Sequence, residues 1–212
     1  PLNLAGENGR NVFTVRSFDG AIALRSYLDS ERPQRAVIIG GGYIGIEVGE
    51  ALRLRGIEVT ILEQRETILA DLDPPARNYA GDLLTSHGIT VLPKSLVVGL
   101  PTDQTNRVTH VLTSDGTFAA DLVIVAAGII PMTGLASAAG IRLGTYGGIL
   151  TDQRQQTSVE GIFAAGDCCE YRDIITRKSV YAPLATNGNR AGWVAGGRQR
   201  RAGQRRDDQR IQ

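Results

Sequence analysis

Residues 36–45 read AVIIGGGYIG and decide the fold of this chain. The short apolar run that opens the stretch is typical of a strand buried on both faces of a sheet. Residues 43–55 then carry an apolar face at helical spacing, and Gly56 is placed to end that helix. A second buried strand is predicted over residues 57–62. This order forms a βαβ unit, and its helical crossover implies a parallel sheet.

The glycines of this unit satisfy the pattern G-x-G-x-x-G. Gly40 permits the tight turn, Gly42 lets the backbone approach a pyrophosphate, and Gly45 lets the helix pack closely on the strand. The amino end of the helix can then hold the phosphates. Glu63 follows at the end of the second strand, where it can accept hydrogen bonds from the adenosine ribose hydroxyls. The pattern predicts dinucleotide binding; a glycine turn with no ligand is the alternative.

Two charged residues bear on the choice of dinucleotide. The carboxylate of Glu63 favours NADH, because it would repel the 2′-phosphate of NADPH. Arg65 makes that preference moderate, because an arginine can pair with the phosphate. We therefore expect NADH, with NADPH as a possible second ligand.

The remaining sequence predicts further strands and helices. A strand is expected over residues 11–16, followed by a helix that Ser17 or Asp19 caps and that ends near Leu28. The other predicted elements are a helix over 74–87, an antiparallel meander of strands at 89–92, 95–100 and 107–113 with a turn at 114–116, a strand at 121–126, a loop-rich stretch over 128–160, a strand at 161–165, an excursion over 171–181 and a helix over 184–195.

Composition excludes several classes of protein. Hydrophobic residues make up 42% and charged residues 21%, which are ordinary globular values. No apolar run approaches the roughly 18 residues of a membrane helix, so we expect a soluble protein with no membrane partner. Cys168 and Cys169 are adjacent, and His87 and His110 are isolated, which argues against a disulfide scaffold and a metal site. A reducing cytoplasm is the simplest compartment.

The carboxyl end differs in charge from the rest of the chain. Residues 198–212 carry six arginines and two aspartates, whereas the chain as a whole has a net charge of +1. We expect a disordered, solvated basic tail and no nucleic-acid partner, because nucleic-acid-binding domains carry their basic groups on a folded face. Binding of nucleic acid through this tail is the alternative. The chain begins at Pro1 and its single methionine is Met132, so we expect a piece of a longer protein or a processed product.

Three motifs in order resemble those of the pyridine nucleotide-disulfide oxidoreductases, the flavoprotein reductases that bind two dinucleotides. Residues 39–47 (IGGGYIGIE) resemble the family's NAD(P)H motif, and residues 121–131 are similar to the segment where the chain leaves the NADH domain. Residues 157–168 resemble the second flavin motif. The resemblance covers residues 11–197, and residues 181–187 look closest to the coenzyme A disulfide reductase and NADH oxidase branch.

This resemblance implies an α/β fold with two cofactor regions. A Rossmann-like NAD(P)H domain, with a parallel sheet and an antiparallel meander, would be followed by the carboxyl-terminal part of a Rossmann-like FAD domain. The implied cofactors are FAD and NADH. The implied segments are a linker or end of the first flavin segment at 1–32, the NAD(P)H domain at 33–150, the FAD part at 151–197 and the tail at 198–212.

The resemblance also implies roles around the nicotinamide, where this chain's catalytic positions would lie. Tyr43 would be a movable ring that covers the flavin, and Glu47 would accept a hydrogen bond from the nicotinamide carboxamide. Gly128 would allow the nicotinamide end to approach closely. The alternatives are a core aromatic, a surface glutamate at a helix start and an ordinary glycine at a strand exit.

On the flavin side, Asp167 would accept a hydrogen bond from a ribityl hydroxyl. Ala185 and Thr186 would direct N–H groups of a helix start at the flavin pyrimidine. Cys168 and Cys169 are not the family's redox cysteines, so we expect them to be inert. The complete set of implied cofactor-binding residues is Gly40, Gly42, Tyr43, Ile44, Gly45, Glu47, Glu63, Gly128, Gly166, Asp167, Leu184, Ala185 and Thr186.

The family pattern has parts that this sequence lacks. The first flavin-binding unit with the redox cysteine should precede these residues, and a dimerisation domain should follow them. We therefore expect a fragment of an oxidoreductase that passes hydride from NAD(P)H to flavin and on to a disulfide, a peroxide or oxygen. Its intact parent would be a homodimer, whereas the fragment alone would bind NADH, hold FAD weakly or not at all, and be inactive. A non-catalytic NAD-binding module and an inactive truncated gene product are the alternatives.

Overall fold

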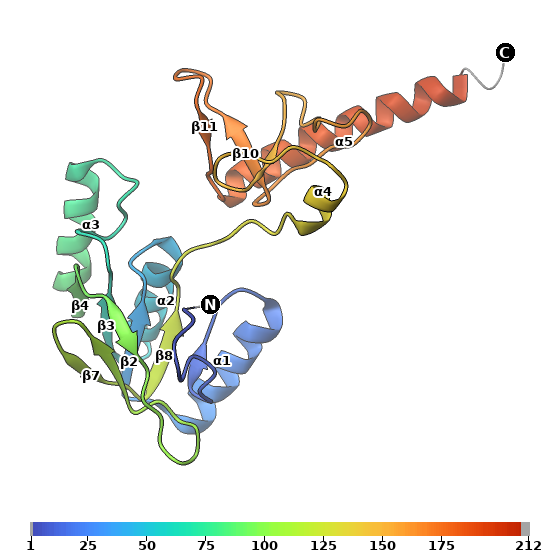
Figure 1. Cartoon of the computed structure of the whole chain (residues 1–212). Coiled ribbons are helices and arrows are strands. Elements are labelled where there is room, and N and C mark those ends of the chain that lie inside the picture. The colour runs from blue at the N-terminus through green and yellow to red at the C-terminus, as the bar shows by residue number, and fades with distance from the viewer. Residues whose placement is uncertain (1, 209–212) are drawn as a thin grey trace. The chain divides into compact units, whose positions relative to one another are not determined.

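The computed structural model describes the backbone of residues 2–208 and the side chains of residues 2–197. The chain divides into two compact units, Pro1–Gly128 and Ile129–Gln212. Figure 1 shows the elements of each unit. The first unit includes residues 12–31: their strand pairs within its sheet, and their helix packs against that sheet. The predicted boundaries at 33, 151 and 198 concern the cofactor that each segment serves, and they stay predictions.

A five-stranded parallel sheet in the order β1-β8-β2-β3-β4 forms the centre of the first unit. In the central register, Ile39 at the end of β2 pairs with Leu62 of β3 and with Val125 of β8. The carboxyl ends of these three strands therefore meet at one edge. The strands are β1 (Val12–Phe13), β2 (Arg35–Ile39), β3 (Glu58–Leu62), β4 (Ile89–Leu92) and β8 (Leu122–Val125).

The two faces of this sheet are covered differently, which explains the apolar run in β2. Ala36 and Ile38 belong to a core shared with helices α1 (Phe18–Glu31), α2 (Tyr43–Leu54) and α3 (Pro74–Ser86). Val37 and Ile39 belong to a second core, which the meander closes. Successive side chains of a strand point to opposite faces, so a strand buried on both faces is apolar throughout. The predicted βαβ unit and parallel sheet are confirmed.

The meander is confirmed, with one correction to its membership. It consists of β5 (Val97–Gly99), β6 (His110–Thr113) and β7 (Thr117–Ala119), all antiparallel. Residues 89–92, predicted as its first strand, pair instead in parallel with β3. A half-buried strand has the same sequence pattern in either orientation, so alternation alone does not reveal which strand is its neighbour.

The second unit has a small core and a three-stranded sheet in the order β11-β10-β9. Its elements are α4 (Gly134–Ala138), β9 (Ile149–Leu150), β10 (Cys169–Arg172), β11 (Ser179–Val180) and α5 (Ala185–Asp208). The predicted excursion over 171–181 is mostly the antiparallel hairpin β10–β11. The strand predicted over 161–165 is wrong, because only Phe163 pairs there, in an isolated bridge with Gln156. An apolar run becomes a strand only where a neighbour completes the hydrogen-bond ladder.

Helix α5 is longer than predicted. It was expected to end near Ala195, with a solvated tail over 198–212, but its helical backbone continues to Asp208. Arginine, alanine and glutamine are good helix formers, and this lets a polar sequence continue a helix without an apolar face. Residues 209–212 of the predicted tail lie outside the described residues.

Candidate functional site

The glycine turn lies where the strands β2, β3 and β8 end. The N–H of Gly40 donates to the carbonyl of Leu62 at 2.8 Å, and the N–H of Ala126 donates to the carbonyl of Ile39 at 2.8 Å. Gly40 has a φ of +112°, and a Cβ there would overlap the carbonyl oxygen of Ala126. Only glycine fits this position. Parallel α/β sheets bind ligands at this carboxyl edge.

Gly45 brings helix α2 close to the sheet. Its added Cβ would overlap the carbonyl oxygen of Gly40 and lie 3.3 Å from Cγ2 of Ile38. Gly41, which the motif leaves open, is equally confined, since its Cβ would lie 2.5 Å from Cγ2 of Ile68. The sequence motif did not identify Gly41 as constrained. The packing role predicted for Gly45 matches this geometry.

Gly42 differs from its neighbours because it is open. Among the described residues, no atom beyond Gly42, its two neighbours in the chain and the adjoining helix backbone lies within 4 Å of a Cβ built on Gly42. It is the N-cap of α2, and it has no side chain to cap the helix. The N–H groups of the first helical turn have no acceptor within the helix, so they face this open space with the positive end of the helix dipole. A phosphate group fits here, and the extra methyl of an alanine would take up part of the space.

Glu63 is buried at the end of β3 and is tied to the glycine turn. Its Oε2 accepts a hydrogen bond from the N–H of Gly41 at 2.8 Å, and its Oε1 accepts one from the N–H of Arg65 at 2.8 Å. An ionised carboxylate has about four lone-pair sites, so both oxygens retain capacity for ribose hydroxyls. The sequence predicted the ribose role; the tie to the turn is an additional role that spacing alone did not reveal.

Two cations lie in the segments that follow Glu63 and β4. The guanidinium of Arg65 is exposed and is 4.0 Å from the carboxylate of Asp71. The ammonium of Lys94 pairs with Glu66 at 3.2 Å, also at the surface. Such exposed pairs are weak, about 0–1 kcal/mol, so a phosphate can compete for these cations. This arrangement is compatible with NADPH as well as NADH.

The predicted nicotinamide residues are accessible on the first turns of α2 and at the end of the unit. Tyr43 and Ile44 are 47% and 37% exposed, and Glu47 is exposed. Tyr43 is therefore not a core aromatic. Gly128 has a φ of +100°, and within the described part of the chain nothing lies within 4 Å of its added Cβ. The contacts of these residues with a nicotinamide stay predictions.

The second unit holds the predicted flavin residues. Gly166 has a φ of +90°, and the side chain of Asp167 is exposed beside it. Leu184, Ala185 and Thr186 are exposed at the start of α5. A hydrogen bond of 2.9 Å from the hydroxyl of Tyr181 to the carbonyl of Asp167 links the glycine–aspartate turn to the segment that leads into α5. Sequence reasoning did not identify this tyrosine.

The adjacent cysteines differ in exposure. Cys169 is buried, and burial, followed by the neighbouring Cys168, raises the pKa of its thiol to about 12. The two sulfur atoms are 3.8 Å apart, too far for a disulfide. A thiol with this pKa is not a nucleophile near neutral pH. The inert role predicted for Cys169 is consistent with this environment.

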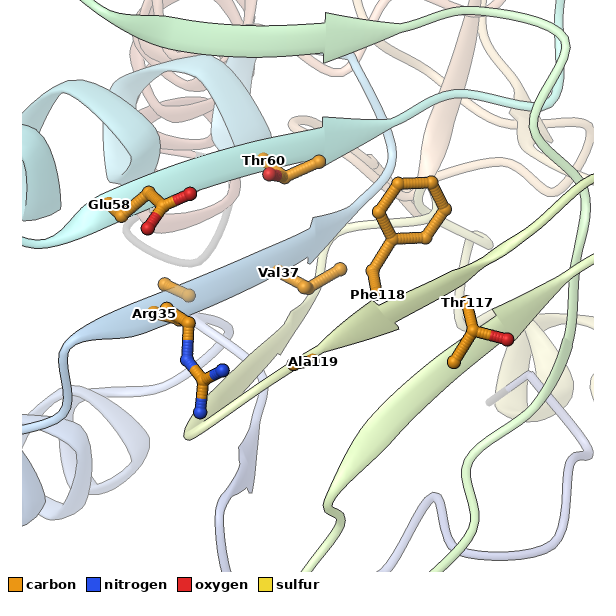
Figure 2. Close-up of a pocket in the computed structure, with 8 residues that line it drawn as sticks. Arg35, Val37, Glu58, Thr60, Thr117, Phe118 and Ala119 are labelled. Carbon is orange, nitrogen blue, oxygen red and sulfur yellow. The ribbon is translucent and has the colours of Figure 1, made fainter.

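A cleft of about 210 Å³ lies away from the glycine turn, at the opposite ends of β2 and β3. Figure 2 shows Arg35 and Val37 from β2, Glu58 and Thr60 from β3, and residues 117–119 from β7 around it. The guanidinium of Arg35 is already paired with Asp121 at 3.0 Å. The cleft contains none of the predicted site residues, and we assign it no cofactor.

Metal ligands and membrane spans are the last two features considered among the described residues. No cluster of three or more histidine, cysteine or acidic side chains suited to a metal ion occurs among them. Likewise, none of the helices within that part of the chain combines the length and apolar character needed to cross a membrane.

Comparisons with known proteins agree with the motifs. A family model described as pyridine nucleotide-disulphide oxidoreductase matches residues 1–192. The chain is 39% identical over 194 residues to an NAD(P)H coenzyme A polysulfide/persulfide reductase of Pyrococcus horikoshii, covering 91% of this chain and 43% of that protein. The chain thus spans less than half the length of this curated relative.

Two solved structures show the same fold. An FAD-dependent pyridine nucleotide-disulphide oxidoreductase from Desulfovibrio vulgaris has a TM-score of 0.83 and 33% identity, covering 93% of this chain and 50% of that one. A water-forming NADH oxidase from Lactobacillus brevis, bound to NADH, has a TM-score of 0.83 and 27% identity, with 92% and 43% covered. The predicted resemblance is confirmed, including the reductase and NADH oxidase branch. The chain belongs to the pyridine nucleotide-disulphide oxidoreductases, a family of FAD-dependent NAD(P)H oxidoreductases.

Proposed function

We propose that the first unit binds NADH or NADPH at the glycine turn and that the second unit carries part of an FAD site. The observation that carries the proposal is the contrast within the turn. Gly40 and Gly45 are confined by packing, whereas Gly42 is open at the amino end of a twelve-residue helix. Packing alone explains the first two glycines. A ligand that must approach the backbone explains the third.

Each residue of the first unit has a defined task in this proposal. The free N–H groups at the start of α2 hold the pyrophosphate, and Glu63 accepts hydrogen bonds from the adenosine ribose while keeping the turn in place. Ile44 lies beside the pyrophosphate. Tyr43 and Glu47 lie at the nicotinamide end, and Gly128 leaves room for it. The nicotinamide domain is assigned to residues 33–150, of which residues 33–128 lie in the first unit.

The second unit supplies fewer groups, assigned to residues 151–197. Asp167 accepts a hydrogen bond from a ribityl hydroxyl, with Gly166 providing the turn before it. Leu184, Ala185 and Thr186 direct the start of α5 at the flavin pyrimidine, where helix N–H groups stabilise negative charge. When bound, the flavin accepts a hydride from the nicotinamide and passes the electrons to a disulfide, a peroxide or oxygen. The intact parent acts as a homodimer in the cytoplasm.

Calorimetric titration of the full chain with NADH and then NADPH tests the nucleotide site. We expect saturable binding of both, tighter for NADH. At about 100 times its dissociation constant, the ligand should add about 2.7 kcal/mol to the free energy of unfolding of the unit that binds it. Absence of binding by a folded chain would contradict the proposal.

Two alanine variants separate ligand binding from folding. Gly42→Ala places a methyl in the open space, so we expect a folded chain whose NADH affinity falls by about ten-fold or more, because phosphate contact requires close backbone approach. Gly81→Ala is the matched control: Gly81 lies inside α3, and no atom of the described residues is within 4 Å of its added Cβ. It should be slightly stabilising and leave the affinity unchanged. Equal affinities in the two variants would count against the pyrophosphate assignment.

A further inference from the structure

Two tyrosine hydroxyls hold the backbone of the Gly166–Asp167 turn. The Tyr171 hydroxyl accepts a hydrogen bond from the N–H of Gly166 at 3.0 Å and donates one to the carbonyl of the same residue at 3.1 Å. The Tyr181 hydroxyl donates to the carbonyl of Asp167 at 2.9 Å. Both peptide groups that flank the turn are therefore bonded to phenols.

The turn has few other attachments. The segment before it was expected to be a strand, but its ladder is reduced to the single bridge between Phe163 and Gln156. The carbonyl of Gly166 also accepts the N–H of Cys169 at 3.0 Å, which only closes the turn on itself. Among the described residues, the hydrophobic cluster of this unit is small, with four buried members, Ala136, Ile141, Ile149 and Cys169. Hydrogen bonds, more than packing, therefore fix this turn.

One phenol comes from the first strand of a hairpin and the other from the residue directly after its second strand. Tyr171 lies in β10 and pairs with Val180 of β11, and Tyr181 follows Val180 directly. Both rings are only partly exposed, and burial raises the pKa of Tyr171 and of Tyr181, so both hydroxyls stay protonated near neutral pH. A protonated phenol can donate and accept at once, as Tyr171 does.

A buried glutamate fixes the hairpin itself. Glu170 is 1% exposed, and its Oε1 accepts the N–H groups of Tyr146 at 2.7 Å and Gly148 at 3.0 Å. Its Oε2 accepts the hydroxyl of Ser179 at 2.6 Å, which joins β10 to β11. These three hydrogen bonds tie the hairpin to residues 146–148 and join its two strands, so they hold the strands that carry the two tyrosines.

We infer that Tyr171 and Tyr181 are positioning residues that fix the backbone at Gly166 and Asp167, so that the exposed Asp167 carboxylate is held ready for a hydroxyl-rich ligand. The ligand, the ribityl chain of FAD, rests on the proposed function. The hydroxyls of both tyrosines are bonded to the backbone of the turn. They remove the conformational freedom that Asp167 would otherwise lose on binding, and a preorganised group binds more tightly for that reason.

Amide hydrogen exchange of the full chain, followed by NMR, tests the inference without any ligand. In Tyr171→Phe we expect exchange at the Gly166 amide to accelerate about ten-fold, because its acceptor is lost. Tyr181→Phe should shift the resonances of Asp167 and Cys168 with a smaller effect at Gly166. Tyr146→Phe is the matched control, since Tyr146 lies in the same unit with a ring 58% exposed. Unchanged exchange at Gly166 in Tyr171→Phe would overturn the inference.

Titration of the same samples with FAD separates the inference from the proposed function. We expect FAD at high concentration to shift the Asp167 and Cys168 resonances, with an affinity that falls about five-fold or more in the double variant Tyr171→Phe/Tyr181→Phe and stays unchanged in Tyr146→Phe. Equal loss in the Tyr146 control would overturn the positioning role. A different outcome is that FAD shifts no resonance of the second unit in the unaltered chain, while Tyr171→Phe still accelerates exchange at Gly166. In that case the FAD assignment is wrong, and so is the ligand named in the inference.

Discussion

The two glycine turns of this molecule are held in place by different interactions. The turn at residues 40–45 lies on a five-stranded sheet, and three of its four glycines are confined by neighbouring atoms. The turn at Gly166 has no atom of the described residues within 4 Å of its added Cβ and is held by tyrosine hydroxyls. The first turn is therefore fixed by packing, and its three confined glycines leave no room for a larger residue. The second is set by hydrogen bonds from a neighbouring hairpin.

The largest expected effect comes from adding a methyl to the first turn. Gly40→Ala forces a φ of +112° on a residue with a Cβ and drives that Cβ into the carbonyl of Ala126. Backbone strain of about 1–3 kcal/mol adds to an overpacking cost of about 1–3 kcal/mol. We expect the free energy of unfolding, from urea denaturation, to fall by about 4 kcal/mol. The matched control is Gly128→Ala, where φ is +100° but the space is open, so only the backbone cost should apply. Equal losses would mean that packing does not set the first turn.

The second prediction concerns the side-chain hydrogen bond that Glu63 makes to the packed turn. Glu63→Gln keeps one acceptor oxygen but turns the other into a donor, which leaves the N–H of Gly41 or Arg65 unpaired. A buried unpaired N–H costs about 1–3 kcal/mol, and we expect a loss of about 2 kcal/mol in unfolding free energy with weaker NADH binding. Glu66→Gln makes the same chemical change on an exposed side chain nearby. If both variants lose the same small amount, Glu63 does not fix the turn.

Tyr171→Phe should cost less than either change in the first turn. Two hydrogen bonds to Gly166 are lost, but the turn is only half-buried, so water can replace part of the lost hydrogen bonding. We expect a loss of about 1 kcal/mol, measured by thermal unfolding. Stability should also decline at alkaline pH. Burial raises the pKa of Tyr171 in the folded chain, so the unfolded chain loses this proton at a lower pH. The free energy of unfolding therefore falls as pH rises above the ordinary value of 10.0. Tyr171→Phe should flatten that decline; an unchanged profile would contradict the assignment.

The contrast between the turns also explains what could be predicted from sequence. The first turn is predictable because its determinants are local: an apolar strand, glycines at fixed spacing and a helical period follow one another within residues 36–55. The second turn was predicted in part, as Gly166 and Asp167, through the family resemblance. Its tyrosines were missed, because Tyr181 lies 14 residues from Asp167 and only the hairpin brings the two together.

The errors have the same origin in contacts distant along the chain. Residues 89–92 were assigned to the meander and residues 161–165 to a strand, because an apolar pattern reports burial and does not identify the neighbouring strand. The bond from Glu63 to the turn was also not predicted, because its partner Gly41 lies 22 residues away; the ribose role of Glu63 stays a prediction. In both segments the sequence pattern did not identify the hydrogen-bonding neighbour.

The smallest expected effect is the response of each unit to acid. In the first unit, hydrogen bonds from Arg35 lower the pKa of Asp121, which joins β8 to β2. In the second unit, hydrogen bonds from the N–H and hydroxyl of Thr176 lower the pKa of Asp173 at the hairpin turn. Above the ordinary value of 3.8 both carboxylates are ionised and their stabilisation is present. As pH falls through the depressed values, the unfolded chain binds more protons, so this stabilisation is lost.

Solvent screening limits the contribution of Asp121 to under about 1 kcal/mol. We expect Asp121→Asn to lower the urea midpoint of the first unit at pH 7 and to have a smaller effect near pH 3. Asp173→Asn should destabilise the second unit alone. Amide exchange, followed separately in each unit, would show both effects. If either substitution loosens both units equally, then they do not unfold separately, and the two turns could not be compared as independent structures.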